Sequence, residues 1–206
     1  LLAAIHEAKG RQSIQTTSRP DILETLVAVA RIQSTDASNR IEGISTSDSR
    51  LNDLVSEKVT PRNRNEEEIA GYRDVLWAIH ESHDYIPITP NVILQLHRDL
   101  FRHTPLTFAG HFKDSDNIII ERDAHGTSTV RFAPPSALVT PELIERACSA
   151  YTQAIRDEHT DPLLAIAMFI LDFTCIHPFN DGNGRMSRLL TLLMLYRNGY
   201  MVGKYI

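Results

Sequence analysis

Apolar and polar positions follow one another along this chain mainly with the period of an α-helix. Apolar residues recur at helical spacing in the segments 1–10, 20–42, 65–85, 90–103, 142–158, 163–176 and 185–198. The 163–176 segment is apolar around nearly its whole circumference, so we expect it to be the most buried helix. The polar segments 11–19 and 44–60 predict a loop and a connector.

The segment 104–135 is the least helical part of the chain. Its runs 117–120 and 129–132 are rich in β-branched or apolar residues, and a polar stretch that contains Gly126 separates them. This arrangement predicts a β-hairpin. The chain as a whole therefore predicts an all-α fold, mainly a helical bundle, with one β-hairpin insertion.

Composition narrows the range of functions. The 206 residues suffice for one substantial domain, and 21 basic against 26 acidic side chains leave a net charge of −5, which argues against a general affinity for nucleic acid. Because the longest apolar run ends at Asp172, we predict no membrane partner. Cys148 and Cys175 lie in apolar helical surroundings and are expected to be buried thiols, which fits the cytoplasm. His80 and His83 lack further ligands nearby, and we interpret them as surface residues.

A dense polar stretch, HPFNDGNGRMSR, fills residues 177–188 between two apolar helices. Burying so many polar groups is costly, so a role in structure alone does not account for them. Gly182 and Gly184 permit backbone angles that turn successive N–H groups inward as an anion-binding nest. The next helix is expected to begin near Arg185, where its N-terminus adds further donors.

The side chains of the same stretch suit phosphate chemistry. Arg185 and Arg188 are three residues apart, share a helix face and carry planar forks that match phosphate oxygens. Asp181 is a hard oxygen ligand of the kind that Mg²⁺ prefers. His177 can take a proton near neutral pH. These residue types together predict phosphoryl or nucleotidyl transfer.

The stretch resembles the motif of the Fic (Fic/Doc) family, His-x-Phe-x-Asp/Glu-Gly-Asn-Gly-Arg-x-x-Arg. The resemblance implies the Fic fold and a protein adenylyltransferase, which moves AMP from ATP, with Mg²⁺, to a Ser, Thr or Tyr hydroxyl of a target protein. It implies that His177 is the catalytic base and Asp181 the metal ligand. The implied nucleotide- and phosphate-binding residues are Gly182, Asn183, Gly184, Arg185 and Arg188.

Residues 38–43 resemble the inhibitory motif of the same family, Ser/Thr-x-x-x-Glu-Gly/Asn. The match falls on Ser38, Glu42 and Gly43 at the end of a predicted helix. It implies that Glu42 pairs with Arg188 and thereby occupies the arginine that a γ-phosphate needs. The alternative is a solvated helix end that Gly43 caps.

The segments 109–113 and 132–135 resemble those that flank the Fic "flap", a hairpin that holds the target by strand pairing. Main-chain pairing of this kind suits an exposed hairpin edge. The alternative is an ordinary surface hairpin. The implied docking residues are Asn117, Ile118, Ile119, Ile120, Thr129, Val130, Arg131 and Phe132.

The resemblance divides the chain into an N-terminal helical extension, 1–60, and a catalytic core, 61–206, which we expect to continue further. It leaves room for a homodimer, and for DNA binding through a domain beyond residue 206. Other activities stay open: phosphotransfer, removal of AMP with Glu42 positioning water, or a non-catalytic nucleotide-binding module. Phosphotransferases of the family carry Lys at the place of Gly184, so the glycine favours AMP transfer.

Overall fold

The computed structural model describes residues 1–16, 20–122, 126–157 and 159–202. The fold is mainly helical with a small antiparallel hairpin, as the sequence predicts. The α-helices are α1 Leu2–Thr16, α2 Pro20–Ile41, α3 Asp48–Val55, α4 Arg64–Ser82, α5 Pro90–Leu100, α6 Thr140–Arg156, α7 Pro162–Ile176 and α8 Asn183–Arg197, with 3₁₀ turns at His83–Tyr85 and Ala137–Val139. No described helix is sufficiently long and apolar to traverse a bilayer.

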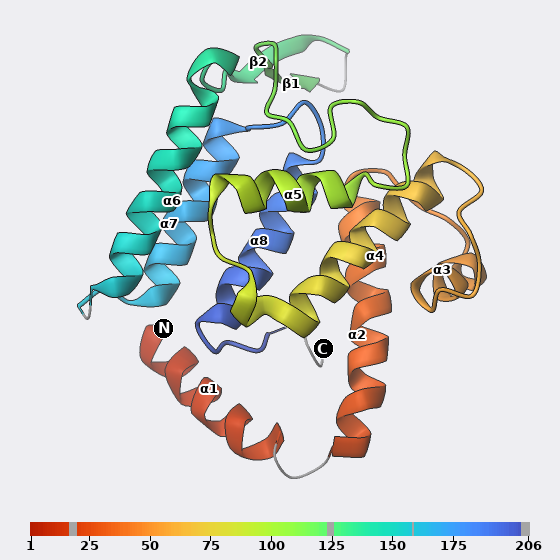
Figure 1. Cartoon of the computed structure of the whole chain (residues 1–206), viewed down its shortest axis with the longest axis vertical. Coiled ribbons are helices and arrows are strands. Elements are labelled where there is room, and N and C mark those ends of the chain that lie inside the picture. Colours follow the sequence, from red (N-terminus) through yellow and green to blue (C-terminus); the bar gives the residue numbers. More distant parts are fainter. Residues whose placement is uncertain (17–19, 123–125, 158, 203–206) are drawn as a thin grey trace.

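Helix α8 forms the centre of the bundle (Figure 1). It contacts α7 on one side and α4 on the other, and the upper, C-terminal part of α2 also reaches it. Most of its apolar residues are fully buried, among them Leu189, Leu190 and Leu193. A helix with neighbours on several sides has to be apolar around most of its surface. The central position of α8 places its N-terminus, and the loop before it, inside a rigid frame.

Helix α7 is less buried than its composition predicts. It packs on α6 and α8 through one face, which includes Phe169 and Phe173, whereas Leu164, Met168 and Leu171 are each more than half exposed. The prediction that α7 is the most buried helix was therefore wrong. Cys175, on the outer side of α7, is likewise exposed rather than buried, although Cys148 is buried as expected.

Three further local predictions need correction. Helix α1 continues to Thr16, through most of the predicted loop. The connector 44–60 contains helix α3, in which Leu51 and Leu54 are buried against Ile69 of α4. His80 is buried rather than a surface residue, and its ring packs edge-to-face on that of Tyr196 with 5.5 Å between the ring centroids.

The hairpin pairs β1 (Ile119–Arg122) with β2 (Ser128–Phe132), and the register is irregular between Ile119 and Ile120. The first strand thus begins two residues later than predicted. Every residue of β2 is exposed. The hairpin stands at one end of the molecule, close to the loop that joins α7 to α8 (Figure 1).

Candidate active site

The loop between α7 and α8 is fixed from both sides. His177 ends α7 in the left-handed conformation, with φ of 50°, which a residue other than glycine adopts only when its surroundings hold it there. Phe179 is fully buried in the core and anchors this loop. The side chain of Asn183 accepts from the Phe179 N–H at 2.9 Å and donates to the Phe179 carbonyl at 2.7 Å. Asn183 thus positions the loop in addition to starting α8.

Gly182 is the residue at which the chain turns into α8. Its φ of 80° favours glycine, and an added Cβ would lie 2.9 Å from the ring of Phe101. Its N–H donates to Asp181 Oδ1 at 2.6 Å. The first turn of a helix leaves backbone N–H groups without intrahelical partners, so α8 presents an anion-binding end from Asn183 onward. Gly184, in contrast, has ordinary helical angles.

His177 is half-buried at the edge of this site. Burial lowers its pKa below the usual 6.5, the backbone of Thr174 and the carboxylate of Glu42 oppose that shift, and the charge of Lys113 adds to it. Its Nδ1 atom is buried and forms no hydrogen bond within the described chain. A lowered pKa keeps the imidazole neutral at neutral pH, which is the form that accepts a proton.

Arg185 and Arg188 point to different neighbours, although their spacing suggested one shared face. The side chain of Arg185 is only 1% exposed, and its guanidinium lies 2.7 Å from Glu68 Oε2 and 3.7 Å from Asp181 Oδ1. Glu68 also accepts from Arg64 at 2.7 Å. Arg185 therefore belongs to a buried ion-pair network behind the loop rather than to its open side.

Arg188 faces α2. Its Nε donates to Ser38 Oγ at 2.7 Å, and its Nη2 donates to the Ser38 carbonyl at 2.9 Å and to Glu42 Oε1 at 2.7 Å. The Glu42 carboxylate lies directly over Gly184, where an added Cβ would collide with Glu42 and lie 3.2 Å from Arg188 Nη1. Gly43, with φ of 75°, ends α2 just beyond this contact. A protein carboxylate thus occupies the open side of the first turn of α8.

Asp181 is the residue whose fit to magnesium can be assessed. Its side chain is 46% exposed, and Arg64 and Arg185 each lie 3.7 Å from it. No cluster of three ligand-type side chains occurs among the described residues. Mg²⁺ is commonly held by one or two carboxylates together with substrate phosphates. The donor set therefore fits a magnesium ion that binds together with a nucleotide.

The base of the hairpin is tied to the same loop. The Lys113 side chain is buried and donates to Asn117 Oδ1 at 3.0 Å and to the Ile176 carbonyl at 3.1 Å. Asn117 in turn donates to the Phe179 carbonyl at 3.3 Å. Of the predicted docking residues, Asn117 thus contacts the loop, while Ile118, Ile120, Val130 and Phe132 are exposed on the hairpin.

His97 is a site residue that the sequence did not reveal. It is fully buried on α5 and stacks on Phe179 with 3.7 Å between ring centroids. Its Nδ1 accepts from the Gly110 N–H at 3.0 Å, so its Nε2 carries the proton and donates to the Asp181 carbonyl at 3.0 Å. The sequence feature that could have indicated it is the position of this histidine on the apolar face of a predicted helix, four residues after Ile93.

Comparison with known proteins gives relatives that are named Fido domain-containing proteins or protein adenylyltransferases. A Fido domain-containing protein of Dictyostelium discoideum is 36% identical over 90 residues, which are 42% of this chain and 58% of that protein. Protein adenylyltransferase fic-1 of Caenorhabditis elegans is 29% identical over 125 residues, which are 59% of this chain and 22% of that protein. The chain thus spans less than two thirds of the length of these relatives.

Solved structures share the fold. A Fic domain-containing signaling protein from Bacteroides thetaiotaomicron superposes with a TM-score of 0.81 at 23% identity, over 95% of this chain and 73% of that one. A Fic-1 fragment from C. elegans superposes with a TM-score of 0.68 at 23% identity, over 96% of this chain and 56% of that one. The Fic/DOC family model matches residues 87–195, which include the loop and most of α8. This match covers more than half of the chain, and the chain belongs to the Fic/DOC family.

Proposed function

We propose that this chain is a Fic-type protein adenylyltransferase that Glu42 restrains. The observation that carries the proposal is the position of Glu42, whose carboxylate lies over Gly184 and pairs with Arg188 at 2.7 Å. A helix N-terminus beside an arginine favours a phosphate for the same reason that it favours this carboxylate. Relatives that are named protein adenylyltransferases support the same activity.

In the proposed reaction a target hydroxyl attacks the α-phosphorus of ATP. The bond between the α- and β-phosphates breaks, AMP becomes joined to the hydroxyl oxygen, and pyrophosphate leaves. His177 takes the hydroxyl proton as general base, a role that typically contributes about 10²–10⁴-fold. Burial supports this role because it lowers the His177 pKa and keeps the ring neutral.

The remaining residues bind and orient the nucleotide. Gly182 makes the turn into α8, and the first turn, at Asn183 and Gly184, donates backbone N–H groups to the phosphates. Arg188 orients the β- and γ-phosphates once Glu42 releases it. Arg185 is better suited to hold Asp181 in place, since its guanidinium is buried and already pairs with Glu68 through Nη1. Bound Mg²⁺, held by Asp181, would supply charge neutralisation at the phosphates.

The hairpin is the proposed docking site for the target protein. Its exposed strands and its connection to the loop through Lys113 and Asn117 support this role. A target strand that pairs there would be held by main-chain hydrogen bonds. A homodimer, and DNA binding through a domain beyond residue 206, stay predictions.

The alternatives differ in which group is transferred and in what accepts it. Phosphotransfer would deliver the γ-phosphate, whereas AMP removal would use water in place of the target hydroxyl. The small residue at Gly184 supports AMP transfer, because a long side chain there would occupy the space that Glu42 fills now. A non-catalytic module would bind nucleotide without transferring any part of it.

The test uses ATP labelled either on the α-phosphate or on the γ-phosphate. The Glu42→Gly protein should incorporate the α-label into itself or into an added protein extract, and the Glu42→Gly/His177→Ala protein should incorporate neither label. Incorporation of the γ-label alone would replace AMP transfer by phosphotransfer. Nucleotide binding without incorporation of either label would favour the non-catalytic module.

A further inference from the structure

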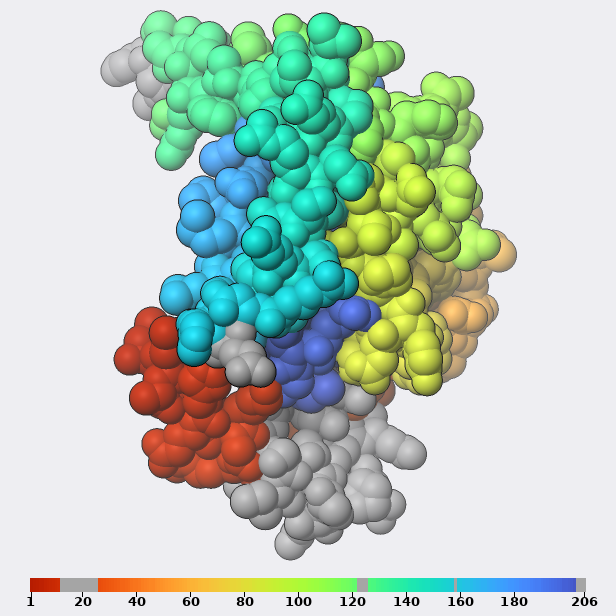
Figure 2. Space-filling model, turned by 60° about the vertical axis from the view of Figure 1, so that its left-hand side comes forward, coloured from red at the N-terminus to blue at the C-terminus, as the bar shows by residue number. Residues whose placement is uncertain are grey.

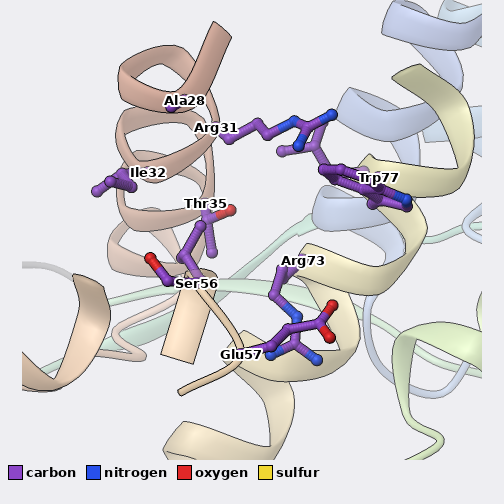
Figure 3. Close-up of a pocket in the computed structure, with 10 residues that line it drawn as sticks. Ala28, Arg31, Ile32, Thr35, Ser56, Glu57, Arg73 and Trp77 are labelled. Atoms are coloured by element: carbon purple, nitrogen blue, oxygen red, sulfur yellow. The ribbon is translucent and has the colours of Figure 1, made fainter. Parts of the chain in front are cut away.

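A pocket lies between α2 and α4 (Figure 3), and none of its lining residues belongs to the loop that carries His177. Its volume is about 390 Å³, which is within the range of small-molecule sites. Helix α2 contributes Arg31 and Thr35, helix α4 contributes Arg73 and Trp77, and the turn after α3 contributes Glu57. Anything bound in this pocket would contact both helices.

One end of the pocket contains polar atoms that lack partners. Thr35 is fully buried, and its Oγ1 atom forms no hydrogen bond within the described chain. The Nε atom of Arg31 is also buried and forms no hydrogen bond within the described chain. These residues are four apart on α2 and therefore lie on one face of the helix. Leaving such groups buried without partners is unfavourable, so this end of the pocket favours a hydrogen-bond acceptor.

The charge at this end favours an anion. Arg31 extends from α2 to Trp77, with its guanidinium 3.4 Å from the ring centroid, and its Nη2 pairs with the half-exposed Glu81 at 3.0 Å (Figure 3). Burial lowers the pKa of Arg31, which the Glu81 charge only partly offsets. Among the described lining residues Glu57 is the one carboxylate, and Figure 3 draws it beside Arg73 at the opposite end. Ile32, Val55 and Leu76 provide apolar walls between the two ends.

We propose that this pocket binds a small carboxylate with an apolar body, and that the bound ligand holds α2 against α4. The carboxylate would accept from Arg31 Nε and Thr35 Oγ1, and the apolar body would lie against Leu76 and Trp77. A ligand that contacts both helices stabilises the state in which they are together. Thr35 lies one turn before Ser38, so the same docked state keeps Ser38 and Glu42 on Arg188. The effect on AMP transfer rests on the proposed function, whereas binding does not.

Trp77 makes binding directly measurable, because it is the one tryptophan of the chain and it lines the pocket. Titration with cyclohexanecarboxylate should give a saturable change in tryptophan fluorescence, and the neutral cyclohexanecarboxamide should bind at least about tenfold more weakly. Thr35→Val should weaken carboxylate binding about fivefold, as expected for one lost hydrogen bond. Thr35→Val removes a hydroxyl that lacks a partner, so the variant should fold at least as stably as the original protein.

Three results would overturn the binding claim: no saturable change, equal affinity for the amide, or unchanged affinity in Thr35→Val. For the effect on α2, the carboxylate should slow hydrogen exchange of the α2 amides and lower AMP transfer by the unaltered protein. It should leave transfer by Glu42→Gly unchanged while still altering Trp77 fluorescence. Binding without slower exchange in α2 would overturn the second half of the proposal. Absence of AMP transfer in both proteins would instead count against the proposed function.

Discussion

At the scale of single residues, His97 holds the loop between α7 and α8 in position. Both of its ring nitrogens are hydrogen-bonded, to Gly110 and to Asp181, and its ring stacks on Phe179. Burial lowers its pKa to about 4. The ring is therefore neutral at neutral pH, and protonation would convert the nitrogen that accepts from Gly110 into a donor, which breaks that bond.

This arrangement predicts a pH-dependent stability. The unfolded His97 has an ordinary pKa of 6.5 and the folded one about 4, so the unfolded state binds a proton first as pH falls. The stabilisation is complete above pH 6.5 and should decline by about 3 kcal/mol between pH 6.5 and 4. Urea unfolding across this range measures the decline.

His97→Gln is the matched control, because its amide can both accept from Gly110 and donate to Asp181 without titrating. The variant should show a shallower loss of stability over the same range. An unchanged slope would mean that His97 does not carry this dependence.

The residues of the motif could be found from the sequence, but not all of their neighbours. The spacing of Gly182 and Asn183 before an apolar helix predicts the turn, and the structure has it. The different surroundings of Arg185 and Arg188 could not be predicted, because they depend on Glu68 of α4 and Ser38 of α2. Those residues are more than a hundred positions away in the chain and meet the arginines only through packing.

At the scale of elements, the contact between α4 and α5 holds His97 in position. Gly71 of α4 has no side chain, and an added Cβ would collide with the backbone carbonyl of Leu100 in α5. Backbone cannot move aside as a flexible side chain can. The close approach of these helices therefore depends on this glycine.

Gly71→Ala should destabilise the protein by about 1–3 kcal/mol, because the two helices must separate. Gly10→Ala is the matched control, since Gly10 is also helical and an added Cβ there meets no atom within 4 Å. The control should be neutral or more stable by about 0.5–1 kcal/mol. Thermal unfolding of both variants measures the contrast, and equal effects would contradict a close contact at Gly71.

Helix types were predictable where the periodic pattern is long, and less so where neighbours decide. Helix α3 has only two turns. Its apolar residues Leu51, Leu54 and Val55 are spaced as in a helix, but so short a pattern does not distinguish a helix from a strand. Helix α7 has enough apolar residues for a central helix, yet the central place belongs to α8. Periodicity predicts which segments form helices. How deeply each helix is buried depends on how many other helices pack around it.

At the scale of the whole molecule, α2 joins two sites. Along one face, α2 lines the pocket with Arg31 and Thr35, and one turn further on it contacts Arg188 through Ser38 and Glu42. The helix also contacts α3, α4 and α8. In the space-filling view of Figure 2, α1 covers the end of the molecule opposite the hairpin. The N-terminal helices are thus packed on the family domain, and a displacement of α2 would free Arg188.

The central claim is that the site transfers AMP and that Glu42 restrains the transfer. Intact-mass spectrometry of three proteins after incubation with ATP and Mg²⁺ tests it most directly: the unaltered chain, Glu42→Gly, and Glu42→Gly/His177→Ala. We predict a gain of about 329 Da per AMP in Glu42→Gly, little gain in the unaltered chain, and none in the double variant. Equal gains with and without Glu42 would contradict the restraint, and a gain that persists without His177 would contradict the assignment of the base.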